Sequence, residues 1–335
     1  MPHTVAVTGA SGFLASELIA QLLARGDNVR GTVRSLADTS KTSHLNALAG
    51  AAERLQLFEA DLLGGAAAFT DVFSGCSIVY HTACPFVVTA RAATLGLDYF
   101  VEPAVRGTVA VLEAAASVPT VTRVVMTSST AAIFRRIVPE GHVYSERDWN
   151  DVTELAERKM WYSIAKTKQE RAAWAFIDER KPSWSLVCIN PTMIAGAARQ
   201  RVLNASLENV ANLANGSSPS VANMNMPWVH VCDVAEAHIA AAHTPSASGR
   251  YMMIASWVPL TESAQIISDL KIAGLIVPTA IPADAVPAPL ASYDSSRVER
   301  ELLGGRKLRG LEECMRDSLS SLIAHGHLPA TAAAT

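Results

Sequence analysis

Short runs of β-branched and apolar residues alternate with stretches whose apolar positions recur at helical spacing. In the first half of the chain the expected strands are 4–8, 28–33, 55–60, 77–81 and 122–127. Helical periodicity fills the intervals, most clearly over 15–25 and 101–116. Strands that alternate with helices form βαβ units, so the pattern predicts an α/β fold with a doubly wound parallel sheet.

The pattern loosens after a sixth expected strand. A long helix at 161–179 leads into strand 184–190, and a last strand at 250–254 returns to the sheet. Residues 196–227 are rich in Asn, Ser and Gly, and later helices are expected near 261–270 and 308–322. We therefore expect a sheet domain made of residues 1–195 and 228–256. The expected smaller, interleaved C-terminal lobe comprises residues 196–227 and 257–330.

Composition excludes several classes of partner. The 335 residues carry a net charge of −3, and no basic run is longer than Arg135-Arg136, which argues against nucleic acid and anionic membranes. The most apolar late stretch, 273–291, contains prolines and Asp284, so it is a poor membrane helix. Five scattered cysteines without a C-x-x-C pair argue against a zinc site and against disulfides. The cysteine pattern leads us to expect no metal. Because no signal-peptide pattern precedes the first strand, we expect a cytoplasmic protein.

A glycine-containing segment lies between the first strand and the first helix. Residues 8–15 read T-G-A-S-G-F-L-A, which fits T-G-x-x-G-x-x-G with Ala15 at the last, small position. A helix N-terminus offers unpaired N–H groups and a positive dipole end, and glycines let a phosphate approach them. A tight turn without a ligand is the alternative. The place of the segment after the first strand of a doubly wound sheet favours a dinucleotide site.

The end of the second strand indicates which dinucleotide binds. Sites for NAD usually have Asp or Glu there, to hold the ribose 2′-hydroxyl. This chain has Arg34 at the tip and Lys41 soon after, with no carboxylate at the tip, which favours the 2′-phosphate of NADP(H). The alternative is that both are ordinary solvated charges. Asp61 and Leu62, after the third strand, are candidate contacts for the adenine amine.

A tyrosine and a lysine four residues apart indicate proton-transfer chemistry. Tyr162 and Lys166 fall on one face of the expected helix 161–179. A positive charge lowers the pKa of a nearby phenol, which could then exchange a proton with a carbonyl oxygen as hydride arrives at its carbon. Thr127-Ser128-Ser129 ends the fifth strand at the edge that faces the ligand crevice. A serine there could hold the substrate oxygen, although helix capping or turn chemistry is the alternative.

Taken together, these segments resemble the extended short-chain dehydrogenase/reductases. The chain is most similar to the branch of dihydroflavonol reductases, cinnamoyl-CoA reductases and NADPH-dependent aldehyde and ketone reductases. The resemblance covers about residues 4 to 320. It is carried by "VTGASGFLAS", "VRGTVRS", "ADL", "HTACP", "VEPAVRGTVAVLEAA", "VVMTSST", "WYSIAKTKQE", "INPTMIAG", "LNAS" and "WVHVCDVAEAHI".

This resemblance implies a Rossmann-type fold and specific roles for residues. Tyr162 would donate the proton, Lys166 would lower its pKa and bind the nicotinamide ribose, and Ser129 would orient the carbonyl. The NADP(H) contacts that it implies, together with those of the glycine segment, are Gly9, Ser11, Gly12, Phe13, Leu14, Arg34, Lys41, Asp61, Leu62, Thr82, Ala83, Tyr162, Lys166, Pro191, Thr192, Met193, Ile194 and Ser206.

Two departures from the branch bear on the substrate. Cinnamoyl-CoA reductases typically have N-W-Y-C-Y-G-K around the tyrosine, whereas residues 160–166 here read M-W-Y-S-I-A-K. Dihydroflavonol reductases usually have Asn where this chain has Phe134. Both departures favour a free aldehyde or ketone over a CoA thioester or a flavonoid. Phe86, Phe134 and Trp228 are the expected pocket residues, with Met193, Met224 and the rest of 200–228 also in reach.

The sequence leaves two alternative functions and several candidate histidines. The alternatives are a nucleotide-sugar epimerase or dehydratase and a non-enzymatic NADP-binding regulator. The basic tip of the second strand argues against the first, and Tyr162 with Lys166 argues against the second. The expected partner is a small carbonyl substrate, and the expected state a monomer or weak homodimer. Among the histidines, His81 is expected to be structural, His230 with Asp233 to form a structural turn, and His238 and His243 to lie on a helix surface.

Overall fold

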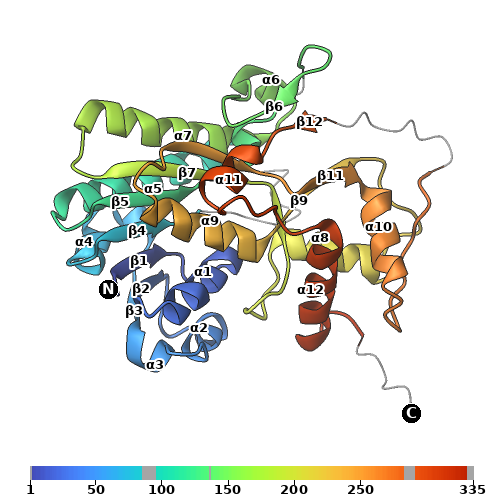
Figure 1. The fold of residues 1–335 in the computed structure, drawn as a ribbon, viewed down its shortest axis with the longest axis horizontal. Helices are drawn as coiled ribbons and strands as arrows, with labels where there is room; N and C mark the ends of the chain where they lie inside the picture. The colour runs from blue at the N-terminus through green and yellow to red at the C-terminus, as the bar shows by residue number, and fades with distance from the viewer. Residues whose placement is uncertain (1, 85–95, 136, 283–290, 330–335) are drawn as a thin grey trace.

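The computed structural model describes residues 2–84, 96–135, 137–282 and 291–329. Its centre is a seven-stranded sheet in the order β3-β2-β1-β4-β5-β7-β10 (Figure 1). All neighbouring pairs are parallel, for example β1 with β4 through Val5 and Ile78. The strands are β1 (Thr4–Thr8), β2 (Asn28–Val33), β3 (Leu55–Glu59), β4 (Ile78–His81), β5 (Arg123–Thr127), β7 (Ser185–Pro191) and β10 (Gly249–Met253). The predicted doubly wound parallel sheet is confirmed, and its order is that of a Rossmann fold.

Helices cover both faces of this sheet. Successive side chains of each strand point to opposite faces, and both faces are apolar. Val5 and Val7 of β1 join a core with α1 (Phe13–Ala24) and α9 (Val231–His243). Ala6 joins a second core with α4 (Ala67–Phe73), α5 (Leu97–Ser117) and α7 (Trp161–Arg180). Shorter helices are α2 (Thr39–Asn46), α3 (Ala51–Arg54), α6 (Val152–Glu157) and α11 (Ser296–Glu301), with 3₁₀ turns at Leu62–Gly64 and Thr130–Ala132.

A smaller group of elements packs beside the sheet. It contains α8 (Ala205–Ala214), α10 (Leu260–Asp269) and α12 (Leu311–Ala324), which lie together at the right of Figure 1. A three-stranded sheet connects it to the centre, in the order β11 (Ser256–Pro259), β9 (Asn225–His230) and β8 (Met193–Ala195). A two-stranded sheet pairs β6 (Val143–Tyr144) with β12 (Ser292–Tyr293). The sequence predicted neither small sheet, nor the helix α8 inside the polar stretch 196–227.

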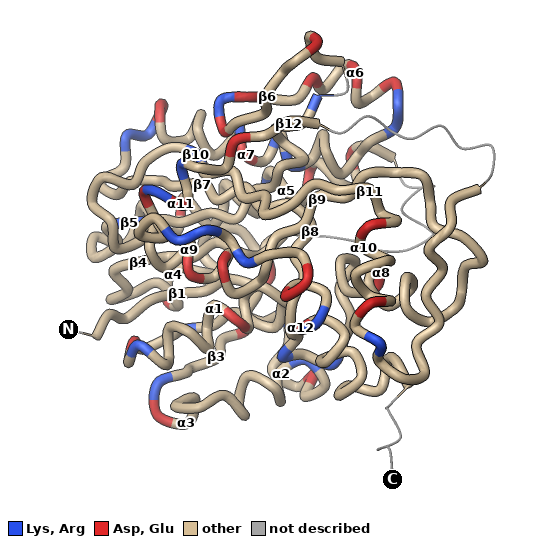
Figure 2. The backbone as a smooth tube through the Cα atoms, turned by 45° about the vertical axis from the view of Figure 1, so that its right-hand side comes forward, with Lys and Arg blue, Asp and Glu red and all other residues tan. Residues whose placement is uncertain are grey.

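The residues expected to return to the sheet domain divide between the two sheets. Within residues 228–256, β10 is a strand of the large sheet and α9 packs against that sheet, whereas β9 pairs with β8 in the small one. Positive and negative residues are interspersed along the chain (Figure 2). Among the described residues, no helix is long and apolar enough to cross a membrane.

Candidate active site

The glycine-containing loop is held against two neighbouring strands. Gly9 has φ +68°, and a Cβ there would lie 3.0 Å from the Cβ of Ala83, so only glycine fits without strain. Its N–H donates to the Thr32 hydroxyl at 3.1 Å. The helix α1 begins after Gly12, whose position carries no side-chain cap, so the first N–H groups of the helix are left for an anion.

Residues after β4 lie at the same edge of the sheet. The Thr82 hydroxyl donates to the Thr8 carbonyl oxygen at 2.5 Å, and the Ala83 N–H donates to the Thr8 hydroxyl at 3.1 Å. Ser11 is half-buried, whereas Phe13 and Leu14 are buried in α1. The structure therefore brings the predicted residues of the loop and of the segment after β4 together.

The tip of β2 has one basic side chain without a partner. Arg34 is exposed and, among the described residues, makes no side-chain hydrogen bond or ion pair. Lys41, in α2, is 3.4 Å from the Asp38 carboxylate, so its charge is already partly neutralised. Asp61 caps the turn Leu62–Gly64 by accepting the Leu63 N–H at 2.8 Å. Of the two predicted phosphate ligands, Arg34 is the more available.

The serine, the tyrosine and the lysine meet above the carboxyl end of β5. Ser129 follows β5 and caps the turn Thr130–Ala132, where its hydroxyl accepts the Ala131 N–H at 3.1 Å. Tyr162 and Lys166 come from the first turns of α7, which begins at Trp161. A hydrogen bond links the Tyr162 and Ser129 side chains. Lys166 is 5 % exposed, while Tyr162 is 36 % exposed and can be reached from outside.

The pKa of Tyr162 differs from the expectation. Desolvation raises the pKa of the phenol more than Lys166 and the Ser129 hydrogen bond lower it, so the net direction is upward. The pKa of Lys166 is also raised: burial lowers it, but Cys84 and Tyr162 outweigh that effect. Tyr162 therefore stays protonated and Lys166 stays charged at neutral pH. A protonated phenol is the form that can donate a proton.

Close to Lys166, α7 carries a buried carboxylate, Glu170, that sequence reasoning missed. Glu170, one turn after Lys166, is fully buried and forms an ion pair with Arg250 of β10 at 2.6 Å. It also accepts hydrogen bonds from Ser128 at 2.6 Å and from Asn190 of β7 at 2.8 Å. Trp174 donates to it at 3.3 Å. A charged residue four positions after the lysine, on the helix face that should be buried, is the signal that could have revealed it.

The segment after β7 lies near α8. Pro191 ends β7 and accepts a hydrogen bond from Ser129 at 3.5 Å. The Thr192 hydroxyl donates to Pro227 at 3.1 Å, and Met193 and Ile194 are half-buried in β8. The Ser206 hydroxyl lies 4.0 Å from the Met193 sulfur. The structure therefore brings Ser129, the 191–194 segment and Ser206 into one region.

The expected substrate residues have different fates. Phe134 is half-buried in an aromatic cluster, 4.5 Å from Trp257 and 5.0 Å from Tyr144 between ring centroids. Trp228 has no exposed surface, and its indole N–H donates to Ser263 at 3.1 Å, so it packs in the core. Met224 is exposed, and Phe86 lies outside the described residues. Sequence reasoning did not group Trp257 and Tyr144 with Phe134, because the three belong to different elements of the fold.

The prediction that His238 lies on a helix surface was wrong. His238 is fully buried, accepts from the Thr127 hydroxyl at 2.7 Å and donates to the Val234 carbonyl at 2.7 Å. Burial lowers its pKa to about 4. His243 is half-buried, with its ring 4.9 Å from that of His3. The face of α9 that carries His238 packs on the sheet, which helical periodicity alone did not reveal.

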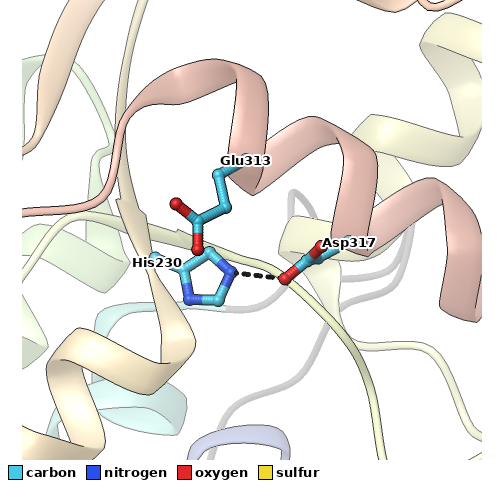
Figure 3. A group of neighbouring side chains, drawn as sticks. All are labelled: His230, Glu313 and Asp317. Carbon is cyan, nitrogen blue, oxygen red and sulfur yellow. Dashed lines mark hydrogen bonds and ion pairs between the residues drawn. The ribbon is translucent and has the colours of Figure 1, made fainter.

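His230 joins α9 to α12, as a structural residue would. Its Nδ1 accepts the Cys232 N–H at 3.2 Å, which places the proton on Nε2, 3.2 Å from the Asp317 carboxylate. Glu313 lies beside them (Figure 3). Asp233 is not the partner of His230, because it binds Arg306 and Arg309 instead. Metal binding at Nε2 would require the proton on Nδ1, which already accepts an N–H, so the geometry favours a structural joint.

A parallel sheet with a glycine loop after β1 and Ser, Tyr and Lys at its carboxyl edge is the arrangement of an extended short-chain dehydrogenase/reductase, an oxidoreductase class. The chain belongs to the NAD dependent epimerase/dehydratase family, whose sequence profile matches residues 5–255. The predicted family resemblance is thereby confirmed.

Relatives and solved structures agree with this assignment. The chain is 38 % identical over 322 residues to a cinnamoyl-CoA reductase of Medicago truncatula, covering 96 % of this chain and 95 % of that one. It is 33 % identical to tetraketide alpha-pyrone reductase 1 of Arabidopsis thaliana, covering 97 % and 96 %. Its structure resembles Gre2 in complex with NADPH from Candida albicans, with a TM-score of 0.83 and 28 % identity, covering 97 % of this chain and all of that one.

Proposed function

We propose that this protein is an NADPH-dependent carbonyl reductase that acts on aldehydes or ketones. The observation that carries the proposal is the meeting of Ser129, Tyr162 and buried Lys166 at the carboxyl edge of the sheet, the edge that also carries the glycine loop. When bound, the cofactor supplies hydride to the carbonyl carbon. Tyr162 donates the proton to the carbonyl oxygen, and the Ser129 hydroxyl orients that oxygen. Lys166 holds a positive charge beside the phenol and stabilises the phenolate left after proton transfer.

The cofactor is proposed from the tip of β2. Arg34 is exposed there without a partner among the described residues, and a guanidinium matches the geometry of a phosphate. The Candida albicans protein that resembles this structure was solved with NADPH. A nucleotide-sugar epimerase is less well supported, because the residue at the tip of β2 is Arg34 and not the Asp or Glu that usually holds an NAD ribose.

The substrate class is proposed from the aromatic cluster. Phe134 lies five residues after Ser129 and packs on Trp257, so an aryl or other apolar group next to the carbonyl would find aromatic neighbours. Cinnamoyl-CoA reduction is the second candidate, since the chain is 38 % identical to an enzyme of that name. The motif around Tyr162 lacks the Cys and Gly that are typical of those enzymes, which favours free carbonyls.

A substrate panel tests this proposal. We expect measurable kcat/KM with NADPH on aryl aldehydes or β-keto esters, and much lower values on cinnamoyl-CoA and dihydroflavonols. Consumption of NADPH should match the formation of the alcohol. Comparable efficiency on cinnamoyl-CoA or a dihydroflavonol would contradict the substrate class, and no turnover with any carbonyl would contradict the function.

Arg34→Ala tests the choice of cofactor. The 2′-phosphate carries close to two negative charges, and one charge-assisted hydrogen bond to it gives roughly tenfold discrimination. We expect KM for NADPH to rise about tenfold and KM for NADH to change little, with a smaller effect at high salt. Lys41→Ala is the comparison variant, with a smaller expected effect because Asp38 pairs with Lys41. Equal loss with both cofactors would show that Arg34 does not read the phosphate.

A further inference from the structure

A line of buried hydrogen bonds runs from Lys166 to the glycine loop. Lys166 Nζ donates to Gln169 Oε1 at 3.2 Å, and Gln169 Nε2 donates to Thr108 Oγ1 at 2.7 Å. Thr108 Oγ1 is 3.1 Å from His81 Nε2, and His81 Nδ1 is 2.9 Å from Thr8 Oγ1. None of these five residues is more than 5 % exposed. The line therefore crosses α7, α5, β4 and β1 inside the protein.

The donors in this line have one consistent direction. The Gln169 amide oxygen accepts from Lys166, so its NH₂ group faces Thr108. The Thr108 hydroxyl can then donate to His81 Nε2, and His81 Nδ1–H to Thr8. Burial and the charge of Lys166 lower the pKa of His81 to about 3, so the imidazole is neutral, as this pattern requires. A buried hydrogen-bond network of this kind fixes the positions of its members.

The far end of the line is the loop itself. Thr8 also accepts the Ala83 N–H on its hydroxyl and the Thr82 hydroxyl on its carbonyl. Gly9 directly follows Thr8 in the chain, and its backbone packs against Ala83. A shift of Thr8 would move the backbone that faces the cofactor phosphates. A shift of Gln169 would move the ammonium beside Tyr162.

We propose that Gln169, Thr108 and His81 are positioning residues that couple Lys166 to the glycine loop. One line of buried hydrogen bonds then fixes the positions of both the Tyr162–Lys166 pair and the loop that would bind the cofactor phosphates. This inference rests on the proposed reductase function. A buried ammonium needs acceptors at fixed places, and the long lysine side chain does not hold one geometry by itself.

Thr108→Val breaks the line at its middle with little change of volume. We expect kcat to fall about tenfold and Kd for NADPH to rise about 3–10-fold, the scale of one lost hydrogen bond. Thr108→Ser keeps the hydroxyl and should restore both values to near wild type. Thr42→Val is the matched control, because Thr42 is also buried but donates only to the Asp38 carbonyl. It should change neither value.

Gln169→Leu breaks the hydrogen-bond line at its Lys166 end. Its readout is the pH dependence of carbonyl reduction, which a change in stability alone would not shift. Because Lys166 lowers the pKa of Tyr162, a displaced ammonium raises that pKa, and the alkaline limb of carbonyl reduction moves to higher pH by about 0.5–1 unit. The titratable groups around the pair are Cys84, Glu170 and His81. In the double variant with Thr108→Val, the two effects on kcat should not add, since both break one line.

The outcomes separate this inference from the reductase function. Suppose that the wild-type protein reduces carbonyls, but that Thr108→Val and Gln169→Leu have the same kcat, the same Kd for NADPH and the same alkaline fall in activity as Thr42→Val. The inference is then overturned and the function stands. If the wild-type protein reduces no carbonyl, the function fails. The coupling is then decided by NADPH Kd from fluorescence titration, which needs no turnover: an unchanged Kd in Thr108→Val overturns it.

Discussion

Replacing Tyr162 by Phe should lower kcat for carbonyl reduction by about 10²–10⁴-fold, the usual scale for a lost general acid. The substitution removes only the hydroxyl, so the ring still packs and NADPH Kd should change less than about threefold. Desolvation raises the pKa of this phenol, so wild-type reduction should be steady through neutral pH and fall only as the phenol ionises in alkaline solution. The measurement is single-turnover oxidation of NADPH with a saturating aryl aldehyde.

The matched control is Tyr99→Phe, which removes a hydroxyl from a tyrosine that is 48 % exposed on α5. A deuterium isotope effect with labelled NADPH establishes that hydride transfer limits the measured rate. If Tyr162→Phe keeps more than about a tenth of wild-type kcat while that effect is expressed, Tyr162 is not the proton donor.

Glu170→Leu should reduce the free energy of unfolding by about 3–5 kcal/mol, because it leaves the Arg250 charge buried without its partner. Arg250 is 7 % exposed and would keep the Glu146 and Asp148 carbonyls, which do not neutralise its charge. Urea denaturation of the protein without cofactor measures the change.

An exposed pair gives the control for this prediction. Glu102 and Arg106 form an ion pair one turn apart on α5, with both side chains about 60 % exposed. Glu102→Gln should cost less than about 1 kcal/mol. Adding Arg250→Met to Glu170→Leu should recover part of the loss, since no unpaired charge then remains. A cost for Glu170→Leu no larger than that for Glu102→Gln would contradict the role assigned to the buried pair.

Local patterns predicted the large sheet well, because its strands are short, mostly apolar runs that alternate with helices along the chain. The expected strands 4–8 and 28–33 coincide with β1 and β2. The strands β8, β9 and β11 escaped detection because they do not alternate regularly with helices and pair with partners distant in sequence. The helix α8 lies in a polar stretch, where propensity alone is a weak guide.

In the candidate site, too, sequence spacing identified local groups of residues but not those brought together only by the fold. Tyr162 and Lys166 are four residues apart on one helix, so spacing alone grouped them. Glu170 and Arg250 are 80 residues apart, and only the order of β5, β7 and β10 in the sheet brings them together. His238 was misplaced for a related reason: which face of α9 is covered depends on packing against β5 and β7.

The pairing of Glu170 with Arg250 also has a consequence for how the chain is made. A growing chain that ends at residue 195 contains Glu170, Ser128 and Asn190, but not the strand β10 that supplies the opposing charge. Closing α7 over the sheet at that stage would bury a carboxylate without its counter-ion. We therefore expect the sheet to close only after Arg250 has been synthesised, and a fragment of residues 1–195 to fail to fold alone, although it holds Ser129, Tyr162 and Lys166.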